Sequence, residues 1–154
     1  MTHLFGVHEQ KVDNKGRVLF PSALKRQLSS EIQNGFVLKK GVFEMYLELY
    51  PMSQWMKEIE GVDKLNRFVE DHTDFIRQFM DGIRILELDD AGRLLIPKDL
   101  MVWAGIEKDV VLSALISKIE IWDKSKYDAN ISNKSKDFSK LAQRVMGGIK
   151  NDSE

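Results

Sequence analysis

The 154-residue sequence contains no cysteine, which excludes disulfides, cysteine-ligated zinc and thiol catalysis and suits a reducing compartment. No apolar run approaches the ~18 residues that a membrane-spanning helix requires. The first nine residues, MTHLFGVHE, place no basic segment before an apolar stretch, so we expect no signal peptide. Together these absences predict a cytoplasmic protein without membrane contact.

An excess of one charge is also missing, because 23 basic residues stand against 24 acidic ones. Any nucleic-acid binding must therefore come from a local basic patch. The nucleotide-binding and hydrolase motifs GxxxxGK[ST], GxGxxG and GxSxG do not occur. The three histidines, His3, His8 and His72, lack the spacing of metal ligands. We therefore expect no enzyme, no metal or other cofactor, and no small-molecule substrate.

The main feature that is present is an internal repeat. Residues 9–26, EQKVDNKGRVLFPSALKR, align with residues 85–102, ILELDDAGRLLIPKDLMV. Six of the 18 aligned positions are identical, whereas unrelated segments share roughly one. The identical pairs are Asp13/Asp89, Gly16/Gly92, Arg17/Arg93, Leu19/Leu95, Pro21/Pro97 and Leu24/Leu100. The chain is therefore a doubled unit.

Each copy predicts the same elements. An alternating stretch enters a four-residue turn, DNKG or DDAG, leaves it as a second strand, and a proline then opens a short helix. The expected strands are 7–12, 17–20, 36–40 and 43–49 in the first copy and 83–88, 93–96, 110–115 and 118–122 in the second, with helices at 21–28 and 97–104. A β-β-α-β-β unit of about 45 residues is too small to bury a core alone. We therefore expect the two units to interleave into one closed β-barrel.

Two further segments lie outside the repeat. Residues 53–81 have apolar residues at helical spacing and predict a helical insertion, separated in two at Gly61, with Asp63 capping the second helix and Gly82 ending it. Residues 125–146 predict a helix that bears Phe138, Leu141 and Val145, followed by Gly147-Gly148 and a loose end. The expected divisions are a first unit at 1–52, the insertion at 53–82, a second unit at 83–128 and a polar tail at 129–154.

The blocks VDNKGRVLFP and LDDAGRLLIP, with the trailing segments LELYPMSQW and IEIWDKSKY, resemble the MraZ family, the two-repeat branch of the AbrB-like swapped-hairpin transcription factors. The resemblance covers nearly the whole chain. It implies an α+β fold, in which the tandem units form one AbrB-like, double-psi-like barrel with a helical insertion and a C-terminal helical tail. The sequence departs from the family at Met101-Val102, where a basic residue is frequent, and at Ser113-Ala114, where a glycine is usual.

The same resemblance implies a function. Members of this family are sequence-specific, DNA-binding transcriptional regulators of the bacterial division and cell-wall gene cluster. They bind short direct repeats in a promoter as ring-like homo-oligomers. The resemblance therefore implies double-stranded DNA and further copies of the chain as partners, and a cytoplasmic, nucleoid-associated location.

The two copies share their scaffold but not their charge. Residues 9–26 carry five basic residues against two acidic ones, whereas residues 85–102 carry two basic residues against four acidic ones. A phosphate backbone would be attracted to the first surface and repelled by the second. We therefore assign DNA contact to the first unit and a structural role to the second.

The predicted DNA contacts are Lys11, Asn14, Lys15, Arg17, Lys25 and Arg26. An arginine suits a guanine edge or a phosphate, whereas the lysines suit phosphates. Asp13, Gly16, Asp89, Gly92 and Arg93 are predicted to maintain the two turns. Two alternatives stay open: Arg17 can brace its hairpin through Asp13 as well as contact DNA, and Asn14 can stabilise its turn rather than reach a base.

An alternative from another class is a protein-interaction β-barrel, an adaptor without a nucleic-acid role. Such an adaptor would use the apolar insertion and the tail rather than the basic hairpin. Under either interpretation, the apolar residues of the insertion and the tail have no evident partner within one chain. We therefore expect a homo-oligomer well above a dimer.

Overall fold

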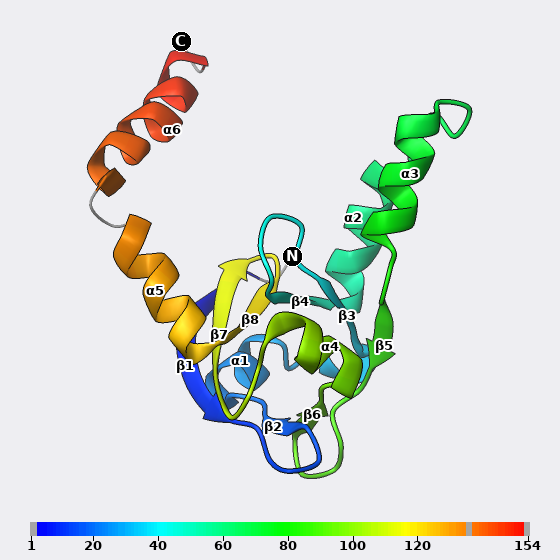
Figure 1. The fold of residues 1–154 in the computed structure, drawn as a ribbon, viewed down its shortest axis with the longest axis vertical. Coiled ribbons are helices and arrows are strands. Elements are labelled where there is room, and N and C mark those ends of the chain that lie inside the picture. The colour runs from blue at the N-terminus through cyan, green and yellow to red at the C-terminus, as the bar shows by residue number, and fades with distance from the viewer. Residues whose placement is uncertain (1–2, 135–136, 153–154) are drawn as a thin grey trace. The chain divides into compact units, whose positions relative to one another are not determined.

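The computed structural model describes residues 3–134 and 137–152. The chain separates into two compact units, one that ends at Lys124 and one that begins at Ser125. The first unit combines an antiparallel sheet with helices (Figure 1). The α+β class expected from the sequence is therefore confirmed.

Both sequence copies fold in the expected β-β-α-β-β order. The first copy consists of β1 (Leu4–Lys11), β2 (Arg17–Leu19), α1 (Ser22–Gln27), the 3-10 turn η1 (Ile32–Asn34), β3 (Phe36–Lys40) and β4 (Leu47–Pro51). The second copy consists of β5 (Arg84–Leu86), β6 (Arg93–Leu95), α4 (Lys98–Ala104), β7 (Asp109–Ile116) and β8 (Ile119–Asp123). Pro21 and Pro97 lie directly before α1 and α4, where a missing N–H leaves no helical hydrogen bond unmade.

The strands of the two copies are exchanged between the copies. The sheet order is β1-β7-β8-β4-β3-β5, and all neighbours are antiparallel. The first strand of the first copy, β1, pairs along its whole length with β7 of the second copy. In return, β5 of the second copy pairs with β3 of the first. Neither copy therefore completes its sheet without the other.

The expectation of a closed barrel is wrong. β2 and β6 pair only with each other, as a separate two-stranded ribbon, and a single bridge between Val12 and Val18 links that ribbon to the end of β1. The free edge of β1 is occupied at Phe5, whose N–H donates to Gln27 Oε1 (3.0 Å) and whose carbonyl accepts from Gln27 Nε2 (3.2 Å). Gln27 therefore satisfies the two backbone groups of Phe5 that another strand would otherwise pair with.

The main core lies between one face of the sheet, the β2–β6 ribbon and the helices α1 and α4. It is built from equivalent residues of the two copies. Three such pairs are Val18/Leu94, Phe20/Ile96 and Leu24/Leu100, and every one of these side chains is at most 1% exposed. Removal of this apolar surface from water is the dominant stabilising contribution to the fold.

The opposite face of the sheet carries a second, smaller cluster and a buried charge pair. Val37, Tyr50 and Trp55 pack together with Phe79, which joins β3 and β4 to the insertion. Beside this cluster, the Lys39 ammonium lies 3.2 Å from Glu48 Oε1, with both side chains at most 3% exposed. Burial lowers the pKa of Lys39, and the neighbouring Glu48 carboxylate opposes that shift. Lys118 also pairs with Glu48.

The insertion contains two helices, α2 (Met52–Asp63) and α3 (Glu70–Phe79), but the expected break at Gly61 is wrong. α2 runs through Gly61, because one exposed glycine costs a helix only about 1 kcal/mol. The break follows instead at residues 64–69, where Asn66 Oδ1 accepts the N–H of Phe68 (3.0 Å). Asp63 is the last residue of α2 and pairs with Arg67 (2.7 Å), so it does not cap α3.

The expectation of a single helix over 125–146 is wrong, because the C-terminal segment forms two helices, α5 (Lys124–Lys134) and α6 (Phe138–Asp152). The expected helix end at Gly147-Gly148 is wrong, because α6 continues through both glycines. Glycine lowers helix propensity but keeps the N–H that the helical hydrogen bond needs. Among the described residues, no helix combines the length and the apolar character that crossing a membrane requires.

Candidate nucleic-acid interface

The two repeated turns are built by one aspartate each. Asp13 Oδ1 accepts the backbone N–H groups of Lys15 and Arg17, both at 2.9 Å, while its Oδ2 accepts Arg17 Nε at 2.7 Å. Asp89 makes the equivalent bonds to Ala91 (3.0 Å), to the Arg93 N–H (2.9 Å) and to Arg93 Nε (3.0 Å). The Asp-x-x-x-Arg spacing therefore encodes one turn geometry twice.

Both aspartates are held in their ionised form. The backbone N–H of Arg17 is the first cause that lowers the pKa of Asp13, and its guanidinium adds to the effect. The backbone N–H of Arg93 lowers the pKa of Asp89 in the same way. Hydrogen bonds to a carboxylate favour its charged form, so each turn is intact at neutral pH.

A glycine closes each turn against the other copy of the unit. Gly16 has φ +87°, and a Cβ atom there would lie 2.9 Å from the Ile96 carbonyl oxygen. The Gly16 carbonyl accepts the Ile96 N–H at 2.8 Å, and the Gly92 carbonyl accepts the Phe20 N–H at 3.0 Å. Any other residue at Gly16 would strain the backbone and push this contact between the copies apart.

Each turn consequently lies beside the helix of the opposite copy. Lys25 of α1 occupies the space that a side chain on Gly92 would need. Its equivalent at the repeat offset, Met101 of α4, lies against Gly16, with its sulfur 3.4 Å from where a Cβ atom would be. Because the strands are exchanged, the first turn lies beside α4 of the second copy and the second turn lies beside α1 of the first copy.

The six predicted DNA contacts are not brought together as one patch. Asn14 and Lys15 line a groove of about 560 Å³ beside the first turn, and Lys11 and Arg17 belong to the strands that enter and leave that turn. Lys25 lies across the second turn, in a groove of about 530 Å³. Arg26, the next residue on α1, is exposed and is grouped with Lys25, next to the second turn rather than the first.

Sequence reasoning missed two basic residues at the first turn. Lys98 and Lys108 line the same groove as Asn14 and Lys15, and the Lys108 carbonyl accepts the Val12 N–H at 2.8 Å. Both lysines belong to the second copy, so counting charge over contiguous segments assigned Lys98 to the acidic surface. Only the exchange of strands places them beside the first turn.

The charge difference between the two turns persists after this rearrangement. Around the first turn are Lys11, Lys15, Arg17, Lys98 and Lys108, against Asp13, Glu107 and Asp109, the strand partner of Lys11. Around the second turn are Lys25, Arg26 and Arg93, against Glu87, Asp89 and Asp90. The first surface is basic, whereas the second has equal numbers of each charge.

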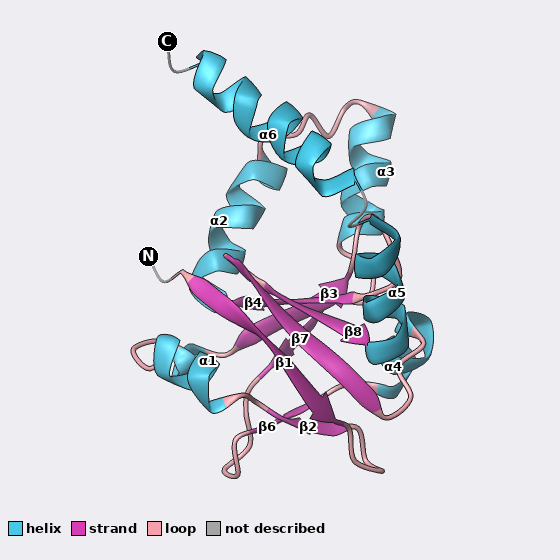
Figure 2. Ribbon diagram, turned by 90° about the vertical axis from the view of Figure 1, so that its left-hand side faces the viewer, coloured by secondary structure: helices cyan, strands magenta, loops and turns pink. Residues whose placement is uncertain are grey.

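The β2–β6 ribbon places both repeated arginines on one face. Its register pairs Arg17 with Leu95 and Leu19 with Arg93, while Val18 and Leu94 point into the core. Leu19 and Leu95 are each 51% exposed. Figures 1 and 2 both show the two turns at the end of the first unit where this ribbon lies, away from α2 and α3.

The contact between Arg17 and Asp13 engages one nitrogen of the guanidinium group, Nε. Within the described residues, the two terminal nitrogens of Arg17 make no hydrogen bond or ion pair. The bond from Nε to Asp13 fixes the plane of the Arg17 guanidinium and leaves its two terminal nitrogens available. Arg17 can therefore stabilise its turn and contact a ligand at the same time.

In the part of the chain that the structure describes, no group of three or more His, Asp or Glu side chains is arranged to hold a metal ion. His72 Nδ1 accepts the Asn66 N–H at 3.0 Å and so stabilises the loop before α3.

Tandem units with exchanged strands, whose Asp-x-x-x-Arg turns project from one end, define the two-repeat AbrB-like class of swapped-hairpin proteins.

Comparison with known proteins identifies the family within that class. The family model described as "MraZ protein, putative antitoxin-like" matches residues 4–78 and 80–148. The Transcriptional regulator MraZ of Flavobacterium psychrophilum is 51% identical over 152 residues, which cover 99% of this chain and 97% of that protein. Those of Christiangramia forsetii and Clostridium tetani are 52% and 34% identical, over 96% and 91% of this chain and 95% and 94% of theirs. The chain belongs to the MraZ family.

Proposed function

We propose that this chain is a sequence-specific, DNA-binding transcriptional regulator of the bacterial division and cell-wall gene cluster. It binds short direct repeats in a promoter as a ring-like homo-oligomer, in the cytoplasm and associated with the nucleoid. Family membership and the names of the relatives support a role in transcriptional regulation, which is not an enzyme class. The observation that carries the DNA contact is the basic surface around the first turn.

In this proposal the first turn enters a groove of the duplex. Arg17 presents the free edge of its guanidinium to a guanine or a phosphate, and Asn14 reaches a base from the tip of the turn. Lys11, Lys15, Lys98 and Lys108 contact phosphates, which adds affinity without sequence information. Lys25 and Arg26 reach the backbone from the side of the second turn, where Asp89 and Asp90 reduce their effect.

Several turns must act together, because about five cationic residues per chain release few counterions. A homo-oligomer repeats the same turn at a fixed spacing, and each further site then binds at high effective concentration. Chains arranged head to tail present their turns in one direction, which matches direct repeats rather than palindromes.

The decisive experiment is footprinting, together with gel-shift titration, on the DNA upstream of the protein's own gene at two salt concentrations. Protection at regularly spaced short repeats, with affinity that falls as salt rises, is the expected result. Light scattering on the same protein is expected to give a mass well above that of a dimer. Absence of binding at low salt would contradict the proposal. It would favour the alternative of a protein-interaction adaptor, which the exposed apolar residues of the insertion also support.

A further inference from the structure

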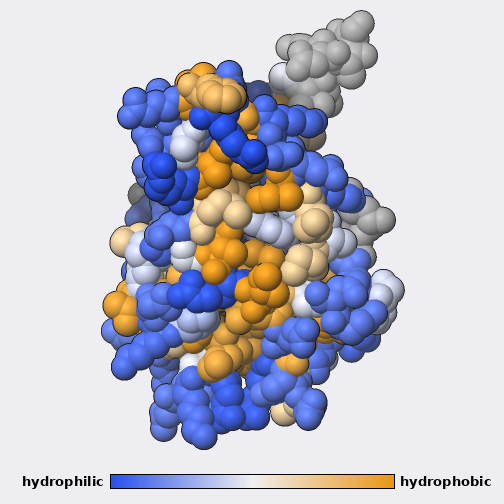
Figure 3. Space-filling model, turned by 90° about the vertical axis from the view of Figure 1, so that its right-hand side faces the viewer, coloured by the Kyte–Doolittle hydropathy of each residue, from blue (hydrophilic) through white to orange (hydrophobic). Residues whose placement is uncertain are grey.

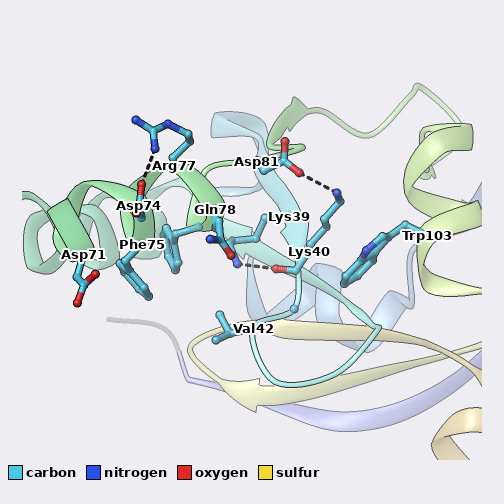
Figure 4. Close-up of a pocket in the computed structure, with 12 residues that line it drawn as sticks. Lys39, Lys40, Val42, Asp71, Asp74, Phe75, Arg77, Gln78, Asp81 and Trp103 are labelled. Atoms are coloured by element: carbon cyan, nitrogen blue, oxygen red, sulfur yellow. Dashed lines mark hydrogen bonds and ion pairs between the residues drawn. The ribbon is translucent and has the colours of Figure 1, made fainter.

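The insertion forms one wall of a groove that the DNA-binding proposal does not use. The α3 groove, of about 610 Å³, lies between α3, the loop from β3 to β4, and α4. Figure 4 shows Phe75, Asp71 and Asp74 on the α3 side, Val42 on the loop side and Trp103 from α4. The groove therefore combines exposed apolar side chains with the carboxylates of α3, and Lys39, Lys40, Arg77 and Gln78 also line it.

Apolar side chains around this groove are unusually exposed. Phe75 is 45% exposed and Val42 is 51% exposed, and the same loop carries Phe43 at 89% and Met45 at 54%. Figure 3 shows that the neighbouring face, which bears α2, α3 and β5, also carries a band of apolar side chains. Clusters of this kind on soluble proteins mark surfaces that bind another molecule.

One of the three acidic side chains that line the groove has no ion-pair partner among the described residues. Asp74 pairs with Arg77 at 2.7 Å, and Asp81 pairs with Lys40 at 2.8 Å. Asp71 has no ion pair within the described residues. Lys39, which also lines the groove, is buried and committed to Glu48, so its charge does not neutralise Asp71.

The C-terminal helix α6 has the complementary properties. Phe138, Leu141 and Val145 follow at steps of three and four residues, so they form one stripe, and they are 65%, 44% and 53% exposed. Between Phe138 and Gly148 the charged residues are Lys140 and Arg144, with no acidic residue. α3, by contrast, carries three acidic residues and one basic residue.

We infer that the α3 groove binds the apolar stripe of α6 from a second copy of this chain. An amphipathic helix in an apolar groove is a recurrent mode of recognition, and the opposite charges of α3 and α6 favour their approach. Groove and stripe are different surfaces, so each chain offers one of each. Such a head-to-tail contact propagates from chain to chain and closes into a ring when the rotation allows. This inference rests on the homo-oligomer of the proposed function and assigns its interface.

Two substitutions in the full chain test the two surfaces of this interface one at a time. Phe75→Ser removes an apolar residue from the groove, and Leu141→Ser removes one from the stripe. Both side chains are partly exposed, so both variants are expected to fold. The matched control is Phe68→Ser, which makes the same kind of change on a fully exposed residue of the insertion that does not line the groove.

Light scattering over a concentration series is expected to show half-assembly of each groove or stripe variant at about tenfold higher concentration than wild type. The control is expected to assemble like wild type. An equimolar mixture of the two variants retains one intact joint per pair, from a normal groove and a normal stripe. At concentrations where wild type assembles but each variant alone does not, it is therefore expected to form two-chain species and nothing larger.

The outcomes also separate this inference from the function. If wild type assembles and both variants assemble equally well, the inference is wrong and the proposed homo-oligomer stands. If the variants dissociate and their mixture remains single-chain, a contact within one chain explains the effect and the inference is again wrong. If wild type is itself a single chain at every concentration, the oligomer of the proposed function fails as well, whatever its DNA titration gives.

Discussion

At the residue scale, the repeated Asp–Arg pair separates folding from recognition. Asp13 and Asp89 receive the same three hydrogen bonds, and Arg17 and Arg93 use the same nitrogen to make one of them. Identical braces cannot account for a functional difference between the copies. Any difference must come from what surrounds each arginine, and only Arg17 is surrounded mainly by cations.

Replacement of each arginine by alanine is expected to have unequal effects on DNA binding. Arg17→Ala removes a base or phosphate contact in every chain, at ~1–3 kcal/mol per base-reading arginine, so several bound chains lose orders of magnitude in affinity together. Arg93→Ala is expected to weaken binding modestly at most. Both pairs lie at the surface, where ion pairs contribute little to stability, so thermal melts are expected to change little.

Gel-shift titrations and thermal melts on the two variants measure these effects. An equal loss of binding in both, with the fold intact, would mean that the outward face of the β2–β6 ribbon contacts DNA as a whole and that the division of roles between the copies is wrong.

The same aspartates predict how stability depends on pH. Their pKa values in the folded protein lie below the ordinary value of 3.8. A lowered pKa means that the stabilisation is present above about pH 4 and disappears as pH falls through the folded-state values. The variant Asp13→Asn/Asp89→Asn is therefore expected to be less stable than wild type at pH 7, with a difference that shrinks below pH 4. Denaturant titrations at pH 7 and at pH 3 test this, and a constant difference would contradict it.

At the element scale, short elements are completed by side chains and by the other copy. β2 and β6 have three residues each and are stable because they pair with each other over the core. β1 has a partner on one side only, and Gln27 supplies the missing donor and acceptor at Phe5 on the other side. A side-chain amide that imitates a neighbouring strand both satisfies the backbone and blocks pairing with another chain.

Gln27→Ala is expected to lower the free energy of unfolding by about 0.5–1.5 kcal/mol, because both hydrogen bonds to Phe5 are lost while water can partly replace them. Urea denaturation measures the change. Gln33→Ala is the matched control, since Gln33 makes only a local bond to the Ser30 carbonyl. An effect no larger than that of the control would show that the edge of β1 needs no cap.

At the scale of the whole molecule, the exchange of strands decides which charges share a surface. Lys98 and Arg93 are five residues apart in the second copy, yet Lys98 lines the groove beside the first turn. The basic surface is therefore a product of both copies, although the motif that it surrounds belongs to one.

Lys98→Ala is accordingly expected to weaken DNA binding and to reduce the slope of log affinity against log salt by about 1, the change for one lost phosphate contact. The loss is expected to be similar for all sequences. Lys57→Ala, on the exposed surface of α2, is the control and should leave the slope unchanged. If Lys98→Ala behaves like this control, the groove beside the first turn does not face the phosphate backbone.

Much of the fold follows from residues that are close together in the sequence. An aspartate, a glycine and an arginine within five positions form each turn, and a proline starts each helix, because these effects act through bonds between near neighbours. The β-β-α-β-β order of both copies and the α+β class are confirmed for this reason. The break at Gly61 was predicted wrongly because the turn around Asn66 is a stronger helix stop than one exposed glycine.

The sequence by itself therefore determined the repeat, the elements, the two turns and the difference in charge between the copies. The tertiary structure alone decided that the sheet stays open, that Lys98 and Lys108 join the first turn, and that Lys25 lies across the second. These features depend on contacts between residues far apart in the sequence, such as Val12 and Lys108, which are 96 positions apart. Burial of a shared core selects such contacts, and that selection depends on the complete set of packed side chains rather than on any local pattern.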